Sequence, residues 1–239
     1  DSIRLREMLA GLTYLKFTFN AASREGYKKI HQVDKFDIAL SKIKECVEIK
    51  KSNDLNVTLG IQMILLPECA DEIVPMARLG AGLGVDYLQI KQFSYIESNL
   101  DKKMKDFDVT EFKKYYPILE QAETFSTENF QVYVKWNAIE AEGRRDYHTC
   151  YGTPFLHHVM SDGKVYPCAI FFNDDEFCFG DLRRDSYKEI LSGEKYRSVV
   201  ERIRSEVDVH SQCGKHCRQN GINSFLYKLK NPPDHINFP

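Results

Sequence analysis

The chain has 239 residues, of which 43% are hydrophobic and 28% charged, and its formal net charge is −2. A nearly neutral chain gives no electrostatic reason to expect nucleic acid or an anionic membrane as a partner. No apolar run approaches the roughly 20 residues that span a bilayer. No signal-peptide pattern is visible, so we expect a cytoplasmic protein with reduced thiols rather than disulfides. The first residue is Asp1 rather than Met, which leaves open a fragment or a processed chain.

The first part of the chain alternates between patterns typical of strands and of helices. The near-continuous apolar run 57–66 indicates a strand buried on both faces of a parallel sheet. Gly84 is expected to end one helix, and Thr110 to cap the start of the next. The alternation predicts an α/β fold with parallel strands and right-handed crossovers. Strands are expected at 15–20, 57–66, 85–92 and 130–136, and helices at 37–50, 68–83 and 110–125.

Parallel sheets of this kind bind ligands at the carboxyl ends of their strands. Those ends lie at 19–23, 63–67, 91–94 and near 136–137, and they carry polar side chains that could line a site or simply face solvent. They are Asn20, Gln62, Gln89, Lys91 and Gln92.

The character of the sequence changes near residue 140, where the charged segment 140–146 is a predicted linker. Beyond it, the β-rich runs 155–160 and 165–170 flank Asp162-Gly163, a strong hairpin signal. Helices are expected at 186–191 and 194–205. We therefore predict two domains, 1–140 and 141–239.

Five of the seven cysteines lie in this second part, and four of them form two separated pairs. The predicted hairpin brings the first pair together, and three residues separate the members of the second. Four thiolates can enclose one metal centre, and soft sulfur ligands favour an iron–sulfur cluster or zinc over hard cations. Spacing alone does not decide between the two. The candidate ligands are Cys150, Cys168, Cys213 and Cys217.

The remaining cysteines are predicted to be packing residues, because free cysteine is among the most buried residue types. Cys46 falls in a predicted helix, Cys69 follows a strand, and Cys178 falls in a predicted strand between two phenylalanines. His210 and His216 lie near the second pair and could replace a thiolate, although an exposed loop histidine is the alternative interpretation.

The pattern Cys150-x12-Gly163-x4-Cys168, followed by Gly180-Asp-Leu and Ser186-Tyr-Lys-Glu-Ile, resembles the C-terminal extension of radical SAM enzymes. This extension is called SPASM or, in a shorter form, twitch. The upstream half resembles the later part of the radical SAM partial TIM barrel. The resemblance implies a partial parallel (β/α) barrel in 1–140 and a small α+β cluster-binding domain in 141–239. The cysteine count is similar to the twitch type, which holds one auxiliary [4Fe–4S] cluster, as in its aminocyclitol-dehydrogenating members.

The resemblance implies a radical SAM oxidoreductase acting on a small molecule such as a sugar or an aminocyclitol. A peptide-modifying enzyme and a zinc-stabilised scaffold without catalysis are the alternatives. The implied cofactors are S-adenosylmethionine (SAM) and a second [4Fe–4S] cluster, whose Cys-x3-Cys-x2-Cys motif is not found in these 239 residues. The implied redox partner is a flavodoxin or ferredoxin. Residues at matching strand ends would contact SAM, namely Thr18, Asn20, Gln62 and Lys91.

Overall fold

The computed structural model describes residues 2–93, 107–215, 217–232 and 234. The described part of the chain divides into two compact units, one of residues 2–93 and 108–140 and one of Phe107 and the described residues from Ala141 onward. Within it, no helix has the length and apolarity needed to cross a membrane. Ser94 and His216 lie outside the described residues, so the structure does not describe the predicted strand end or the possible histidine ligand at these positions.

The first unit is built on a four-stranded sheet in the order β1-β2-β3-β4, in which every neighbouring pair is parallel. This arrangement confirms the predicted α/β fold with a parallel sheet. Residues 59–63 of the second strand are buried, as its continuous apolar pattern indicated. The strands are β1 (Tyr14–Thr18), β2 (Thr58–Leu65), β3 (Tyr87–Gln92) and β4 (Gln131–Val134).

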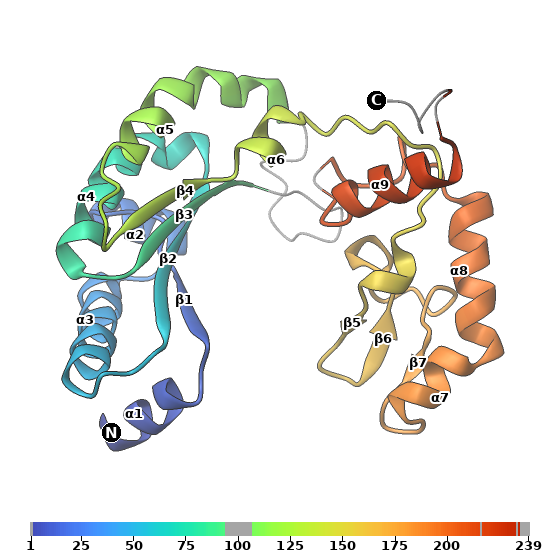
Figure 1. Ribbon diagram of the computed structural model, residues 1–239, viewed down its shortest axis with the longest axis horizontal. Coiled ribbons are helices and arrows are strands. Elements are labelled where there is room, and N and C mark those ends of the chain that lie inside the picture. Colours follow the sequence, from blue (N-terminus) through green and yellow to red (C-terminus); the bar gives the residue numbers. More distant parts are fainter. Residues whose placement is uncertain (1, 94–106, 216, 233, 235–239) are drawn as a thin grey trace. The chain divides into compact units, whose positions relative to one another are not determined.

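Helices α3, α4 and α5 lie along one side of this sheet in Figure 1. Alternate strand residues on that side are apolar and fully buried, among them Ile61, Met63 and Ile90. The opposite side carries most of the polar strand residues, such as Thr18, Gln62 and Lys91. The helical elements of the unit are α1 (Ser2–Ala10), α2 (Arg24–His31), α3 (Phe36–Ser52), η1 (Pro67–Glu72), α4 (Ile73–Leu83), η2 (Val109–Tyr115), α5 (Tyr116–Glu123) and α6 (Trp136–Glu140).

Two predicted helices begin differently in the structure. The first turns of 68–83 and of 110–125 are 3₁₀ helices, and Cys69 interrupts the former with a non-helical backbone. Thr110 is not the helix cap: Asp108 takes that role, and its Oδ1 accepts a hydrogen bond from the Thr110 amide at 2.9 Å. A carboxylate is a good N-cap because it satisfies otherwise unpaired amides. Gly84 ends α4 with a φ of 76°, as predicted.

The loop after β1 and the start of α2 are held by a distant carboxylate. Glu72 accepts hydrogen bonds from the amides of Ala22 and Ser23, at 2.9 and 3.1 Å, and from the Ser23 hydroxyl. Gly26 leaves room for this carboxylate, because a Cβ there would collide with Glu72 Oε1. The negative charge also suits the positive end of a helix. α2 was not predicted from the sequence.

The second unit contains a three-stranded sheet in the order β5-β6-β7, with both strand pairs antiparallel. The predicted hairpin is confirmed, and Gly163 in its turn has a φ of 84°, which favours glycine. The helices predicted at 186–191 and 194–205 are present, whereas α9 was not predicted. The elements are η3 (Thr153–Phe155), β5 (His158–Val159), β6 (Lys164–Tyr166), η4 (Ala169–Phe171), β7 (Gly180–Asp181), α7 (Tyr187–Ser192), α8 (Glu194–Glu206) and α9 (Asn220–Lys230).

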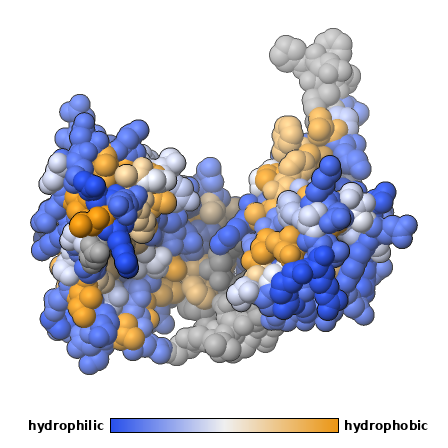
Figure 2. Space-filling model, turned by 90° about the horizontal axis from the view of Figure 1, so that it is seen from below, coloured by the Kyte–Doolittle hydropathy of each residue, from blue (hydrophilic) through white to orange (hydrophobic). Residues whose placement is uncertain are grey.

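The core of this unit lies between the sheet and helices α7 and α8. It comprises Val165, Phe179, Ile190, Val199, Val200, Ile203 and Val207, and Cys150 and Cys213 pack against it. The surface in Figure 2 is mostly hydrophilic with scattered apolar patches, as is normal for a folded domain.

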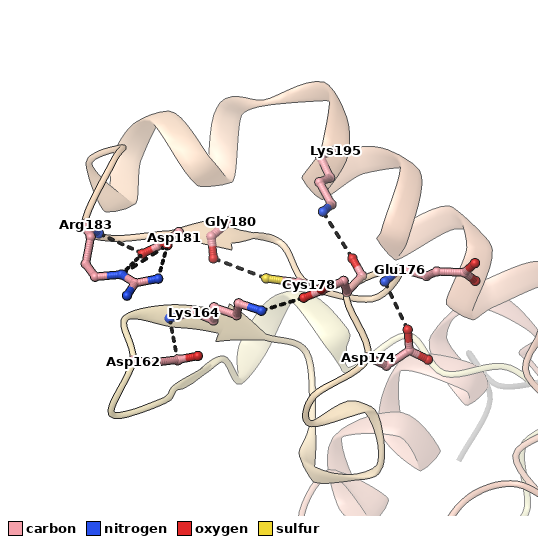
Figure 3. Close-up of polar contacts among 10 residues, drawn as sticks. Asp162, Lys164, Asp174, Glu176, Cys178, Gly180, Asp181, Arg183 and Lys195 are labelled. Carbon is pink, nitrogen blue, oxygen red and sulfur yellow. Dashed lines mark hydrogen bonds and ion pairs between the residues drawn. The ribbon is translucent and has the colours of Figure 1, made fainter.

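Cys178 precedes β7 instead of lying within a strand, since pairing with β6 includes only Gly180 and Asp181 of this segment. Figure 3 shows its sulfur directed at the Gly180 carbonyl oxygen, 3.3 Å away. An ion pair between Lys164 and Asp175 lies nearby. The buried Cys178 therefore makes a local contact with the first residue of β7, as expected of a packing residue.

Candidate metal centre

The four cysteines singled out by spacing come together in the second unit from three separate segments. Cys150 precedes η3, Cys168 is the residue before η4, and the other two lie in the loop between α8 and α9. Charges on the other three sulfurs contribute to the raised pKa of Cys168, so all four lie within electrostatic range of one another. All four are half-buried free thiols.

Burial is the main cause of the raised pKa values of three of these thiols, Cys168, Cys213 and Cys217. It raises the pKa of Cys168 to about 12 and that of Cys213 to about 11, and the charges of neighbouring sulfurs raise them further. Burial is also the main cause of the raised pKa of Cys217. A bound metal reverses this preference, because a coordinating thiol loses its proton to the cation.

Hydrogen-bond donors from the surrounding backbone and side chains point at the sulfurs. The amide of Ile170 donates to Cys168, and the amide of Gln219 donates to Cys217 Sγ at 3.4 Å. At Cys150 Sγ, Asn223 Nδ2 donates at 3.6 Å and Thr153 Oγ1 lies at 3.5 Å. Such donors stabilise sulfur that carries negative charge.

A cation and a buried phenol complete these surroundings. Arg145 donates to the carbonyls of Cys213 and Gly214, and its charge opposes the rise in the pKa of the nearby thiols. Tyr147 donates from its hydroxyl to Asn220 Oδ1 at 2.9 Å. Burial, and then the charge of Cys217, raise the pKa of Tyr147 well above its usual range, so it stays a neutral donor.

Among the described residues, no three His, Cys, Asp or Glu side chains lie close enough together to hold a single metal ion. His210 faces His148, with Nε2 and Nδ1 3.2 Å apart. Cys46 and Cys69 are buried in the first unit, at 3% and 1% exposure.

Three of the four residues proposed to contact SAM share one face of the sheet in the first unit. Thr18 and Gln62 are register partners on adjacent strands, and Lys91 lies on the same face of β3, beside Ile64. This is the face opposite to the helix-covered apolar one. Gln92, also at a strand end, lies on the covered face and is buried.

Asn20 differs from these three because its side chain extends the sheet. Its Oδ1 accepts a hydrogen bond from the Ile64 amide at 2.9 Å, beyond the last backbone bond between β1 and β2. The backbone N–H of Asn20 donates a hydrogen bond to His31 Nε2 at 3.2 Å. With 6% of its surface exposed, Asn20 is thus bound to the backbone of β2 through its amide oxygen.

Several residues around the sulfurs were missed from the sequence. Asn223 lies in the unpredicted helix α9, and Gln219 directly precedes that helix. Thr153 is the first residue of η3. Gln219 Oε1 is buried and has no hydrogen-bond partner among the described residues. The only sequence signal was a group of amide side chains soon after Cys217, at positions 219, 220 and 223.

Comparisons with known proteins agree with this geometry. Residues 150–218 match the family model of SPASM, an iron-sulfur cluster-binding domain. Streptococcus suis SuiB aligns with a TM-score of 0.59 and 12% identity, over 82% of this chain and 47% of that chain. SuiB bound to S-adenosylmethionine aligns with a TM-score of 0.57 and 12% identity, over 82% of this chain and 46% of that chain. SuiB bound to the precursor peptide SuiA aligns with a TM-score of 0.59 and 12% identity, over 84% of this chain and 46% of that chain.

No match was found among curated proteins. The chain spans about half the length of the solved SuiB structures. Residues 150–218 of the second unit are thus similar to a SPASM iron–sulfur cluster-binding domain, and 82% of the chain shares the fold of the SuiB structure. These findings confirm the SPASM part of the resemblance over residues 150–218 and show a fold shared with the SuiB structures.

Proposed function

We propose that this chain is the part of a radical SAM oxidoreductase that binds an auxiliary [4Fe–4S] cluster and contributes the later strands of the SAM-binding sheet. The observation that carries the proposal is the grouping of four thiols within the segment that matches the SPASM domain. The proposed ligands are Cys150, Cys168, Cys213 and Cys217.

The donor set fits such a cluster. Its atoms are four sulfurs, the ligands that iron–sulfur clusters take, and hydrogen-bond donors point at several of them. When bound, the cluster would supply one-electron redox chemistry. The chain's residues would hold it by sulfur and limit its contact with water.

The polar face of the first unit is the proposed SAM side of the enzyme. Thr18, Gln62 and Lys91 would offer hydroxyl, amide and ammonium groups to the polar parts of SAM. Asn20 would support this face by fixing the end of β1 to β2. A second cluster and a flavodoxin or ferredoxin as reductant are part of the same proposal.

For the substrate, a small molecule such as a sugar or an aminocyclitol is the first candidate, because four cysteines provide for one auxiliary cluster, as in the twitch type. A peptide is the second candidate, because the chain has the fold of SuiB, which was solved with a precursor peptide. Incubating the full-length enzyme with SAM and each substrate class, followed by mass spectrometry of the products, separates the two.

Anaerobic reconstitution of the chain with iron and sulfide tests the cluster. We expect a brown protein with roughly four iron ions per chain, as one [4Fe–4S] cluster requires. Alanine at any of the four proposed ligands should remove most of the iron. Cys178→Ala is the matched control, since that sulfur donates a hydrogen bond to the nearby Gly180 carbonyl, and it should keep the iron.

Stoichiometric zinc without iron after anaerobic purification would support the zinc-stabilised scaffold instead. A loss of iron in Cys178→Ala equal to that in the ligand variants would contradict the ligand assignment.

A further inference from the structure

Cys150 differs from the other proposed ligands in receiving two buried polar side chains. Asn223 Nδ2 donates to its sulfur at 3.6 Å, and Thr153 Oγ1 lies 3.5 Å from it. Asn223 is 1% exposed and Thr153 is 2% exposed. Buried polar groups in folded proteins nearly always have hydrogen-bond partners, and here one partner of each is the sulfur.

The orientation of the Asn223 amide is fixed by a second contact. Its Oδ1 accepts a hydrogen bond from the Gly152 amide at 2.7 Å, so the Nδ2 end must face Cys150. Gly152 permits this approach: a Cβ there would lie 3.1 Å from Asn223 Nδ2 and 2.7 Å from Gln219 Oε1. The backbone of the cysteine segment therefore aims an N–H donor at one ligand sulfur.

Such a donor has a definite electrostatic effect on a redox centre. Reduction adds negative charge, part of which resides on the thiolate sulfurs, and an N–H or O–H donor stabilises the reduced form more than the oxidised form. Hydrogen bonds to sulfur are among the factors that set the potential of iron–sulfur clusters. Burial strengthens the effect, because the local dielectric is low.

We propose that Asn223 and Thr153 are positioning residues that raise the reduction potential of the auxiliary cluster through hydrogen bonds to Cys150 Sγ. The inference rests on the proposed function, in which Cys150 is a cluster ligand. With iron bound, the sulfur has no proton, so both side chains act as donors. Nothing in the cysteine spacing indicates this role.

The test is an EPR-monitored redox titration of the anaerobically reconstituted chain. Asn223→Asp keeps an oxygen for the Gly152 amide but replaces the N–H donor by a charged oxygen. Thr153→Val keeps the shape and removes the hydroxyl. Both should shift the midpoint potential to more negative values at unchanged iron content. Ser224→Ala is the control on the same helix, because its hydroxyl donates to Asp146 instead, and its potential should stay at the wild-type value.

A purely structural role would change iron content or stability but leave the potential of the loaded protein in place. If Asn223→Asp does not fold, the shift in Thr153→Val decides. Wild-type potentials in the folded, iron-loaded variants would overturn this inference while leaving the proposed function intact. A wild-type chain that takes up no iron would overturn the proposed function and this inference with it.

Discussion

Replacing Asn20 by alanine should destabilise the first unit, because its side chain supplies the acceptor for a backbone amide of β2. Asn20 Oδ1 accepts from the Ile64 amide at 2.9 Å, and the residue is 6% exposed. Alanine would leave that N–H without its partner near the end of two paired strands. An unsatisfied buried donor costs about 1–3 kcal/mol of the free energy of unfolding.

Urea unfolding followed by tryptophan fluorescence measures this loss in the correct unit. Trp136 is the single tryptophan of the chain, and its indole donates to Glu123 within the first unit. Thr18→Val is the control: Thr18 is exposed at the end of β1, and its change should stay within about 0.5 kcal/mol. Equal stability of Asn20→Ala and Thr18→Val would refute the structural role and leave ligand contact as the use of Asn20.

Three further outcomes are expected. Burial lowers the pKa of His31 from its ordinary 6.5. The unfolded chain therefore binds more protons than the folded one, and the first unit loses stability as the pH falls below 6.5. His31→Gln should reduce this pH dependence of the free energy of unfolding, measured by urea titrations at several pH values. Gly26→Ala should lower the free energy of unfolding by about 1–3 kcal/mol, because the new methyl group crowds the hydrogen-bonded Glu72. Gly82→Ala has open space around it and should raise the free energy of unfolding by up to about 1 kcal/mol. Urea unfolding followed by tryptophan fluorescence measures both. Ser186→Ala removes a capping box and should cost about 0.5–2 kcal/mol, measured by hydrogen exchange in α7.

The strands of the first unit could be predicted because their signals are local. The apolar run around β2 and the alternation in β3 each lie within a few residues of sequence. The hairpin around Gly163 was equally local, since a turn glycine stands between two β-rich runs. The parallel order then followed from the alternation of strands and helices.

The helices that were missed depend on distant contacts. α2 is short and strongly polar, and its start is fixed by Glu72, which is 49 residues from Ser23 in sequence. α9 has no side-chain hydrogen bond at its N-terminus. It is held by contacts such as Asn223 with Gly152, 71 residues away. No local pattern contains such information, because tertiary contacts supply most helix stability.

The two buried asparagines show why the candidate site was only partly predictable. From sequence, Asn20 was the stronger functional candidate, because it ends a predicted strand, whereas Asn223 lies in a segment for which no helix was predicted. In the structure both side chains are held in the same way, because the Oδ1 atom of each accepts a hydrogen bond from a backbone amide. For Asn20 this bond extends the sheet. For Asn223 it directs the amide nitrogen at Cys150 Sγ, and so a residue type without any metal-binding signal acquires a place beside the proposed cluster. Cysteines reveal themselves by number and spacing, but the groups that tune them are ordinary residues, and only the folded backbone determines which of them reach the sulfur.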